Sequence, residues 1–298
     1  MCGIVGLFLK DRSLEPQLGS LLTQMLVSLS DRGPDSAGIA IYGAAKEATG
    51  KVTIQSPAPD ADFSSLEAEL AAAIGEDVAL SRRSTHAVIE VPLEKMEEAK
   101  AAIAKLRPGV RVMGAGSAVE IYKEVGLPAQ VVERFGVSKM AGTHGIGHTR
   151  MATESAVTTL GAHPFSTGPD QCLVHNGSLS NHNNVRRELI HEGMSFETEN
   201  DTEVAAAYLS SKIAHGMDLD EALEASLSDL DGFFTFVLGT KTGFGVVRDL
   251  IACKPAVLAE TDRYVAFGTE YRALAKLPGI EGAKVWEPEP ATVYFWEH

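Results

Sequence analysis

The second residue is a cysteine, in the segment Met1-Cys2-Gly3-Ile4-Val5-Gly6. If Met1 is removed, Cys2 carries both a thiol and a free α-amine. The unperturbed thiol titrates near about pH 8.5 and the α-amine near about pH 7.7 to 8.0, so the amine can accept the thiol proton close to neutral pH. Cys2 is therefore a candidate nucleophile that carries its own base. The alternative interpretation is that a small residue at position 2 only permits the removal of Met1.

Three downstream segments contain groups that such a nucleophile requires. Arg150, in the segment 147–153, carries a planar guanidinium suited to binding a carboxylate. Asn176 and Gly177 combine a side-chain amide with an unobstructed backbone N–H, which are the donors of an oxyanion hole. The segment 199–203 supplies an acidic residue for a substrate ammonium. Together these groups predict a site for an α-amino acid with a reactive side-chain carbonyl.

Each of these groups also has a purely structural interpretation. The pair Asn176-Gly177 is typical of a turn. Arg150 is compatible with a surface ion pair, and Asp201 with a helix cap. The order of all the segments along one chain favours the catalytic interpretation.

The composition limits the classes of partner. The 298 residues include 26 Lys and Arg against 40 Asp and Glu, which gives a formal net charge of −14. This acidity disfavours binding to nucleic acid or to an anionic membrane surface. The sequence contains no apolar run long enough for a membrane span and no secretory leader, so we expect a cytoplasmic protein.

Cysteines and histidines give no pattern of metal ligands. The cysteines are Cys2, Cys172 and Cys253. They form no Cys-x-x-Cys pair and are too few to hold an iron–sulfur cluster. His144, His148 and His175 lack a recurring ligand spacing with carboxylate support. We therefore expect no metal and no cofactor in this chain.

The hydrophobic patterns predict the elements that position the candidate residues. Residues 3–9 are an apolar run typical of a buried strand that begins just after Cys2. Leucines between residues 18 and 29 recur at helical spacing and predict an amphipathic helix. Residues 142–150 are typical of a strand that ends in a functional loop, and a helix is expected to begin near Asp201. Further strands are predicted at 36–42, 51–56, 85–91, 110–113, 233–238, 243–247, 256–258 and 264–267, and further helices at 63–74, 93–106, 118–125 and 218–230.

Alternating strands and helices in the middle of the chain predict an inserted α/β subdomain over residues 57–137.

Five ordered motifs resemble those of the class II glutamine amidotransferases, the N-terminal-nucleophile (Ntn) glutaminases. They are Met1 to Gly6, Arg32-Gly33-Pro34-Asp35-Ser36-Ala37-Gly38, His148-Thr149-Arg150-Met151-Ala152-Thr153, His175-Asn176-Gly177 and Asp201-Thr202-Glu203. Segments 248–255 and 268–274 resemble later strands of the same domain. The resemblance implies one amidotransferase domain over residues 2–298. Its fold would be α+β, a four-layer αββα Ntn-hydrolase sandwich of two antiparallel sheets with the inserted subdomain.

The resemblance also implies a role for each matching residue. Cys2 would be the attacking thiolate, Asn176 and Gly177 the oxyanion hole, and Arg32 and Gly33 the loop that shapes the site beside the cysteine. Thr153 and His175 would contribute to substrate binding, Arg150 would bind the α-carboxylate of glutamine, and Asp201 its α-ammonium. The chain departs from many relatives at Met151 and Glu154, where they carry tryptophan and histidine.

Within the family, the chain looks like the first subunit of three-part, glutamate-synthase-like assemblies. The nearest of these are N-methylglutamate synthase (methylamine–glutamate N-methyltransferase) and its GlxB-like relatives. That resemblance implies glutamine and glutamate as ligands, and partner subunits that hold flavin mononucleotide (FMN) and iron–sulfur clusters in a hetero-oligomer. Three alternatives stay open. The chain could supply ammonia to another glutamate synthase or amidotransferase, act alone as a glutaminase, or serve as a non-catalytic scaffold or sensor of amino acids.

Overall fold

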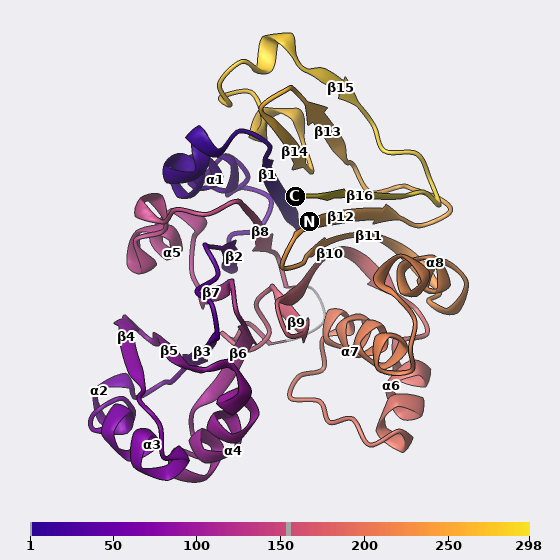
Figure 1. The fold of residues 1–298 in the computed structure, drawn as a ribbon. Coiled ribbons are helices and arrows are strands. Elements are labelled where there is room, and N and C mark those ends of the chain that lie inside the picture. The colour runs from indigo at the N-terminus through magenta and orange to yellow at the C-terminus, as the bar shows by residue number, and fades with distance from the viewer. Residues whose placement is uncertain (1, 153–155) are drawn as a thin grey trace.

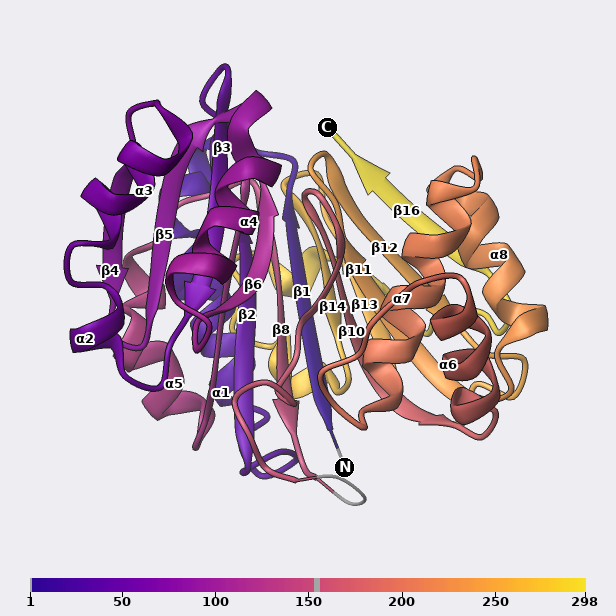
Figure 2. The same ribbon diagram turned by 90° about the horizontal axis from the view of Figure 1, so that it is seen from below.

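A computed structural model describes residues 2–152 and 156–298. Met1 and Thr153 therefore lie outside the described residues, and with Thr153 one predicted substrate-binding position. Two antiparallel sheets lie face to face, and helices cover the outer face of each (Figures 1 and 2). This is the four-layer αββα arrangement that the family resemblance implies. No helix in the described ranges is long and apolar enough to cross a membrane.

The first sheet places Cys2 beside its central strands. In spatial order it contains β15 (Lys284–Trp286), β13 (Val257–Glu260), β14 (Tyr264–Gly268), β1 (Gly3–Leu9), β8 (His144–Arg150), β2 (Ser36–Tyr42) and β7 (Val119–Val125). Strand β1 pairs with β14 on one side and with β8 on the other. Because Gly3 lies opposite Thr149, Cys2 emerges next to the end of β8, where Arg150 lies.

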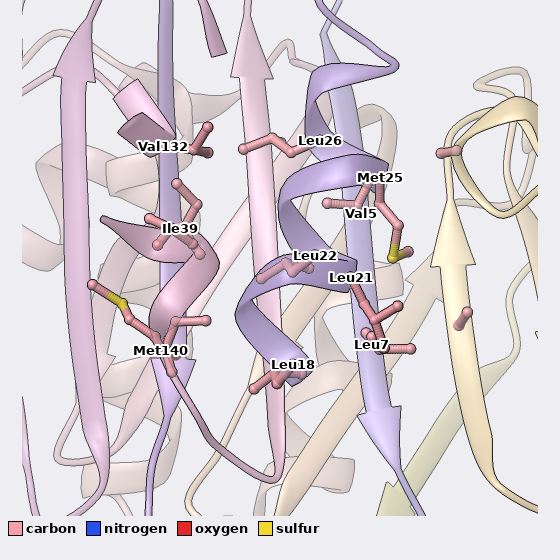
Figure 3. Packing of buried hydrophobic residues seen from close by; sticks show 14 of the residues in the cluster. Val5, Leu7, Leu18, Leu21, Leu22, Met25, Leu26, Ile39, Val132 and Met140 are labelled. Carbon is pink, nitrogen blue, oxygen red and sulfur yellow. The ribbon is translucent and has the colours of Figure 1, made fainter. Parts of the chain in front are cut away.

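Helices α1 (Leu18–Val27) and α5 (Pro128–Phe135) cover the outer face of this sheet. Leu18, Leu22 and Leu26 are spaced one helical turn apart and share one face of α1. They are fully buried and belong to the same apolar cluster as Val5 and Ile39 of the sheet (Figure 3). The predicted amphipathic helix is confirmed.

The second sheet carries the other half of the candidate site. It contains β16 (Val293–Glu297), β12 (Gly243–Arg248), β11 (Gly232–Gly239), β10 (Gln171–Leu179) and β9 (Phe165–Gly168). Helices α6 (His182–His191), α7 (Asp201–Ala214) and α8 (Leu219–Asp229) pack on its outer face. Between the two sheets lies an apolar layer that includes Ile4, Phe8, Ile146, Val174 and Phe244.

A smaller unit is inserted between β2 and β7. Its strands, in spatial order, are β4 (Ala79–Arg83), β5 (His86–Pro92), β3 (Thr49–Gln55) and β6 (Arg111–Gly116), and its helices are α2 (Pro59–Asp62), α3 (Leu66–Ile74) and α4 (Met96–Leu106). With α2 and α3 taken as one helical segment, the chain order β-α-β-β-α-β is that of a ferredoxin-like unit. The described short 3-10 helices lie at Arg12–Gln17, Leu93–Lys95, Val137–Lys139, Tyr271–Ala273 and Ile280–Gly282.

The bounds of this unit differ from the predicted insert over 57–137. Its four strands come from residues 49–116, whereas β7 joins the first sheet and α5 packs on that sheet's outer face. The predicted helix over 118–125 is wrong, because β7 pairs with β2 along its whole length. We propose residues 49–116 as the inserted unit.

Candidate functional site

The nucleophile candidate lines a cavity and lies just before β1. The Cys2 side chain is half-buried, and its Sγ lies 4.0 Å from the carbonyl oxygen of Met151. Burial raises the pKa of the Cys2 thiol, and the positive charge of Arg150 opposes this shift only in part. The thiol is therefore protonated near neutral pH and requires a base before it can attack.

Arg32 and Gly33 pack against residues next to the nucleophile. Arg32 donates from Nε to the Cys2 carbonyl oxygen at 3.0 Å. Its guanidinium also forms an ion pair with Glu270. A Cβ added to Gly33 would lie 2.3 Å from the carbonyl carbon of Thr149, so a larger residue cannot occupy this position without a shift of β8. Together these contacts hold the first residues of β1 against the end of β8.

Asn176 and Gly177 lie within β10, opposite Thr235 and Phe234 of β11. The interpretation of this pair as a turn is therefore wrong. Asn176 is only 3% exposed, and its Nδ2 has no hydrogen-bond partner among the described residues. Gly177 lines the cavity. A Cβ at Gly177 would lie 2.0 Å from the Phe233 carbonyl oxygen, which explains the glycine.

The cavity has a volume of about 350 Å³. Its lining residues are Cys2, Arg150, Met151, Ala152, His163, His175, Gly177, Ser178, His182, Asn183, Glu199, Asn200, Asp201 and Thr202. Arg150 is 5% exposed and donates from one guanidinium nitrogen to the Ala156 carbonyl oxygen at 3.2 Å. Burial of this degree excludes the interpretation of Arg150 as a surface ion-pair residue.

Asp201 is the first residue of α7, and its carboxylate faces the cavity. Its Oδ2 accepts a hydrogen bond from the Leu179 N–H at 3.0 Å, and its Oδ1 lies 3.7 Å from His175 Nδ1. Burial acts to raise the pKa of Asp201, but the His175 imidazole and the Leu179 N–H outweigh it and lower that pKa to about 2. The helix cap is instead Asn200, whose Oδ1 accepts from the Thr202 N–H at 2.9 Å. Asp201 is thus an ionised carboxylate at neutral pH.

His175, a predicted substrate-binding residue, belongs to a buried network that the sequence did not predict. Its Nδ1 lies 2.9 Å from the Thr202 hydroxyl, and His163 Nε2 lies 2.7 Å from the same hydroxyl. The rings of His148 and His163 stack at 3.9 Å between centroids. His148 Nε2 donates to the His175 carbonyl oxygen at 2.9 Å, which links the two sheets. No sequence signal marks His163 as a cavity residue, because its partners lie on other elements.

The described residues offer no cluster of three or more His, Cys, Asp or Glu side chains suited to a metal ion. The cavity instead combines a cation, a carboxylate, a thiol and backbone and amide donors. Such a set can bind an α-amino acid at both of its charged ends and present its side-chain carbonyl to the thiol.

Comparisons with known proteins agree with this chemistry. The glutamine amidotransferase domain family matches residues 148–276. The chain is 70% identical to the glutamine amidotransferase-like protein GlxB of Rhizobium meliloti, over 100% of this chain and 99% of that protein. It is 35% identical to a protein of Methanothermobacter thermautotrophicus that carries a provisional glutamine amidotransferase name, over 99% of both chains.

The fold is also shared with a solved structure. This is the glutamine phosphoribosylpyrophosphate amidotransferase of B. subtilis, with a TM-score of 0.64 at 20% sequence identity. The match covers 99% of this chain and 47% of that one, so the present chain spans about half the length of its structural neighbour.

Proposed function

This chain belongs to the class II glutamine amidotransferases, and we propose that it hydrolyses the side-chain amide of glutamine at Cys2. The observation that carries the proposal is the convergence of Cys2, Arg150, Gly177 and Asp201 on one cavity. Asn176 adds an amide whose Nδ2 has no partner among the described side and main chains. An enzyme must hold donors ready for charge that develops only in the transition state, and such an amide fits that requirement.

In the proposed reaction, Arg150 binds the α-carboxylate of glutamine and Asp201 its α-ammonium. After removal of Met1, the α-amine of Cys2 takes the thiol proton, and the thiolate attacks the amide carbon. A C–S bond forms, and the negative oxygen receives hydrogen bonds from Asn176 Nδ2 and the Gly177 N–H. The α-ammonium of Cys2 returns its proton to the amide nitrogen, the C–N bond breaks and ammonia leaves.

A water molecule then completes the cycle. The α-amine of Cys2 removes a proton from this water as its oxygen attacks the carbonyl carbon of the glutamyl thioester. The C–S bond breaks, glutamate leaves, and the sulfur regains a proton. The raised pKa of the buried thiol is consistent with this scheme, since a base must act on Cys2 before each attack.

The test is to show that the reactive sulfur is that of a first residue. Mass spectrometry of the active protein should find Met1 removed, and a glutamine-mimicking electrophile should label Cys2. Cys2→Ala should abolish glutamate release. Cys253→Ala is the matched control, because Cys253 is an exposed cysteine and its removal should leave the rate unchanged. A protein that retains Met1 and still hydrolyses glutamine would refute the mechanism.

We further propose that the chain is the glutaminase subunit of a glutamate-synthase-like hetero-oligomer, most specifically N-methylglutamate synthase. The sequence resemblance and the full-length match to GlxB support this assignment. Partner subunits would then hold FMN and iron–sulfur clusters and use the ammonia released at Cys2. The experiment is to isolate the native complex, identify its subunits and flavin, and compare methylamine with ammonia as nitrogen donors. A chain that purifies alone, with no methylamine nitrogen in the product, would contradict the assignment.

A further inference from the structure

Lys123 is a buried lysine that the proposed reaction does not use. It lies on β7 and is 4% exposed. Its Nζ donates to the carbonyl oxygens of Leu160, Ala162 and Pro164 at 3.1, 2.8 and 3.1 Å. The same nitrogen lies 4.4 Å from the centre of the Phe165 ring, in a cation–π contact. In the parts of the chain that the structure describes, no carboxylate forms an ion pair with Lys123.

This geometry is that of a protonated amine. An ammonium has three N–H donors, and the three carbonyl oxygens use all of them. A neutral amine has only two N–H bonds, so one of the buried carbonyl oxygens would lose its partner on deprotonation. The loss of a hydrogen bond to a charged donor weakens the hold on the segment 160–164.

The segment that Lys123 holds forms part of the cavity. His163, in its middle, lines the cavity and contacts the Thr202 hydroxyl. The carbonyl oxygen of Gly161 accepts a hydrogen bond from Asn200 Nδ2 at 3.2 Å. Asn200 in turn caps α7, whose first residue is Asp201. A continuous set of contacts therefore leads from Lys123 to the carboxylate proposed to bind the substrate ammonium.

We propose that Lys123 is a positioning residue whose ammonium keeps the segment 160–164, and through it Asp201, in the glutamine-binding arrangement. Lys123 never touches the substrate, yet the protonation of its buried amine then contributes a pH dependence to glutamine affinity. The inference rests on the proposed glutaminase function and deepens it.

The electrostatic surroundings of Lys123 support a transition in an accessible pH range. Burial lowers its pKa to about 7, against the opposing effects of Glu203 and Glu197. The other groups coupled to it are Cys172 of β10, Arg150 of β8, His86 of β5 and His163. Burial raises the pKa of Cys172 to about 12, lowers that of His86 to about 3, and lowers that of His163 well below its usual range, so these three groups keep one charge state near neutral pH. The ammonium is present below the pKa of Lys123 and is lost as the pH rises through it.

The experiment is calorimetric binding of glutamine to the full chain carrying Cys2→Ala, at about pH 6 and about pH 8.5, either side of the expected transition. We expect the dissociation constant to rise about five- to tenfold across this range, which corresponds to roughly one net hydrogen bond. Adding Lys123→Arg should remove the part of the rise that depends on Lys123, because a guanidinium stays protonated throughout. Adding Lys123→Met should weaken binding at both pH values. Lys51→Met is the matched control, because Lys51 is also buried but pairs with Glu120 at 2.8 Å on the inserted unit's side.

The outcomes separate this inference from the function on which it rests. Equal affinity and equal pH dependence with and without Lys123→Met would overturn the inference alone. If Lys123→Met does not fold, a pH dependence that persists unchanged in Lys123→Arg overturns it. If Lys51→Met has the same effect as Lys123→Met, the role is general packing and the inference is wrong. Absence of glutamine binding at any pH, together with a wild-type chain that releases no glutamate, would overturn the proposed function itself.

Discussion

Replacing Asn176 with alanine tests whether the buried amide stabilises charge rather than structure. Its Nδ2 is buried and has no partner among the described residues, so nothing in the resting protein depends on that donor. Loss of one oxyanion-hole donor costs about a hundred- to thousandfold in kcat, or about 2.7 to 4 kcal/mol. We expect this loss in Asn176→Ala, with KM for glutamine within about twofold of wild type, because the interaction forms only in the transition state.

The same change should have little effect on stability. A buried Nδ2 group without a hydrogen-bond partner costs about 1 to 3 kcal/mol in the folded state, and Asn176→Ala removes that cost. The lost packing of the shortened side chain costs about 1 to 2 kcal/mol in the opposite direction. The two effects largely cancel, so Tm should move by only about a few degrees.

The assay is steady-state glutamate release, with the Tm of each variant measured by calorimetry. Thr235→Val is the matched control, because Thr235 lies opposite Asn176 on β11 and its hydroxyl is also buried without a partner in the described chain. It should keep the wild-type kcat. The reasoning is refuted if Asn176→Ala retains a third or more of the activity, or if its lost activity follows a collapse in Tm.

Three further predictions follow from the same geometry. Gly33→Ala should lower the free energy of unfolding by about 1 to 3 kcal/mol, because its Cβ would lie 2.3 Å from the Thr149 carbonyl carbon. Gly282→Ala is the control: this position has open space around it, so calorimetry should find its stability unchanged. The pKa of Asp201 is lowered to about 2, against an unfolded value near about 3.9. Its contribution to folding stability is therefore present above about pH 3.9 and is lost only as the pH falls toward 2. A KM for glutamine that rises below about pH 6 because Asp201 becomes protonated would contradict the assignment. Because burial raises the pKa of the Cys2 thiol, its alkylation rate should increase from about pH 6 to about pH 9, and a rate already at its plateau near pH 6 would contradict a protonated resting thiol.

The sequence predicted those elements whose signal is local. Helix α1 shows its leucines at helical spacing, and β1 is a single apolar run. The helix predicted over 118–125 was wrong, although Val119 and Ile121 show the alternation of a strand. The polar residues of this strand favoured an exposed helix over a buried strand. Lys123 is buried because carbonyl groups of residues 160–164, which are distant in the sequence, accept its hydrogen bonds. The short edge strands β4 and β15 were also missed. Strand β15 pairs with β13, which lies more than twenty residues earlier, whereas β4 pairs with the adjacent β5 but is largely exposed and shows no apolar alternation.

In the candidate site, too, residues within a recognisable motif were predicted and residues that act through distant contacts were not. Motif resemblance identified Cys2 and Arg150, and the cavity brings them together. It did not identify Asn200, whose side chain joins the cap of α7 to Gly161. Nor did it assign a role to Thr202, a residue of the matching motif 201–203 whose hydroxyl bridges two imidazoles from different segments. Contacts of this kind depend on how loops pack after the sheets have formed, and no spacing rule within one segment encodes them.

The relative placement of the two sheets decides whether the groups of the site meet. The register of β1 against β8 pairs Gly3 with Thr149 and so sets Arg150 beside Cys2. The hydrogen bond from His148 to the His175 carbonyl oxygen then fixes β8 against β10 of the opposite sheet. A slip of one residue in β8 would turn Arg150 to the other face and break this bond at the same time. The cross-sheet histidine contact is therefore as necessary to the geometry of the cavity as the residues that line it.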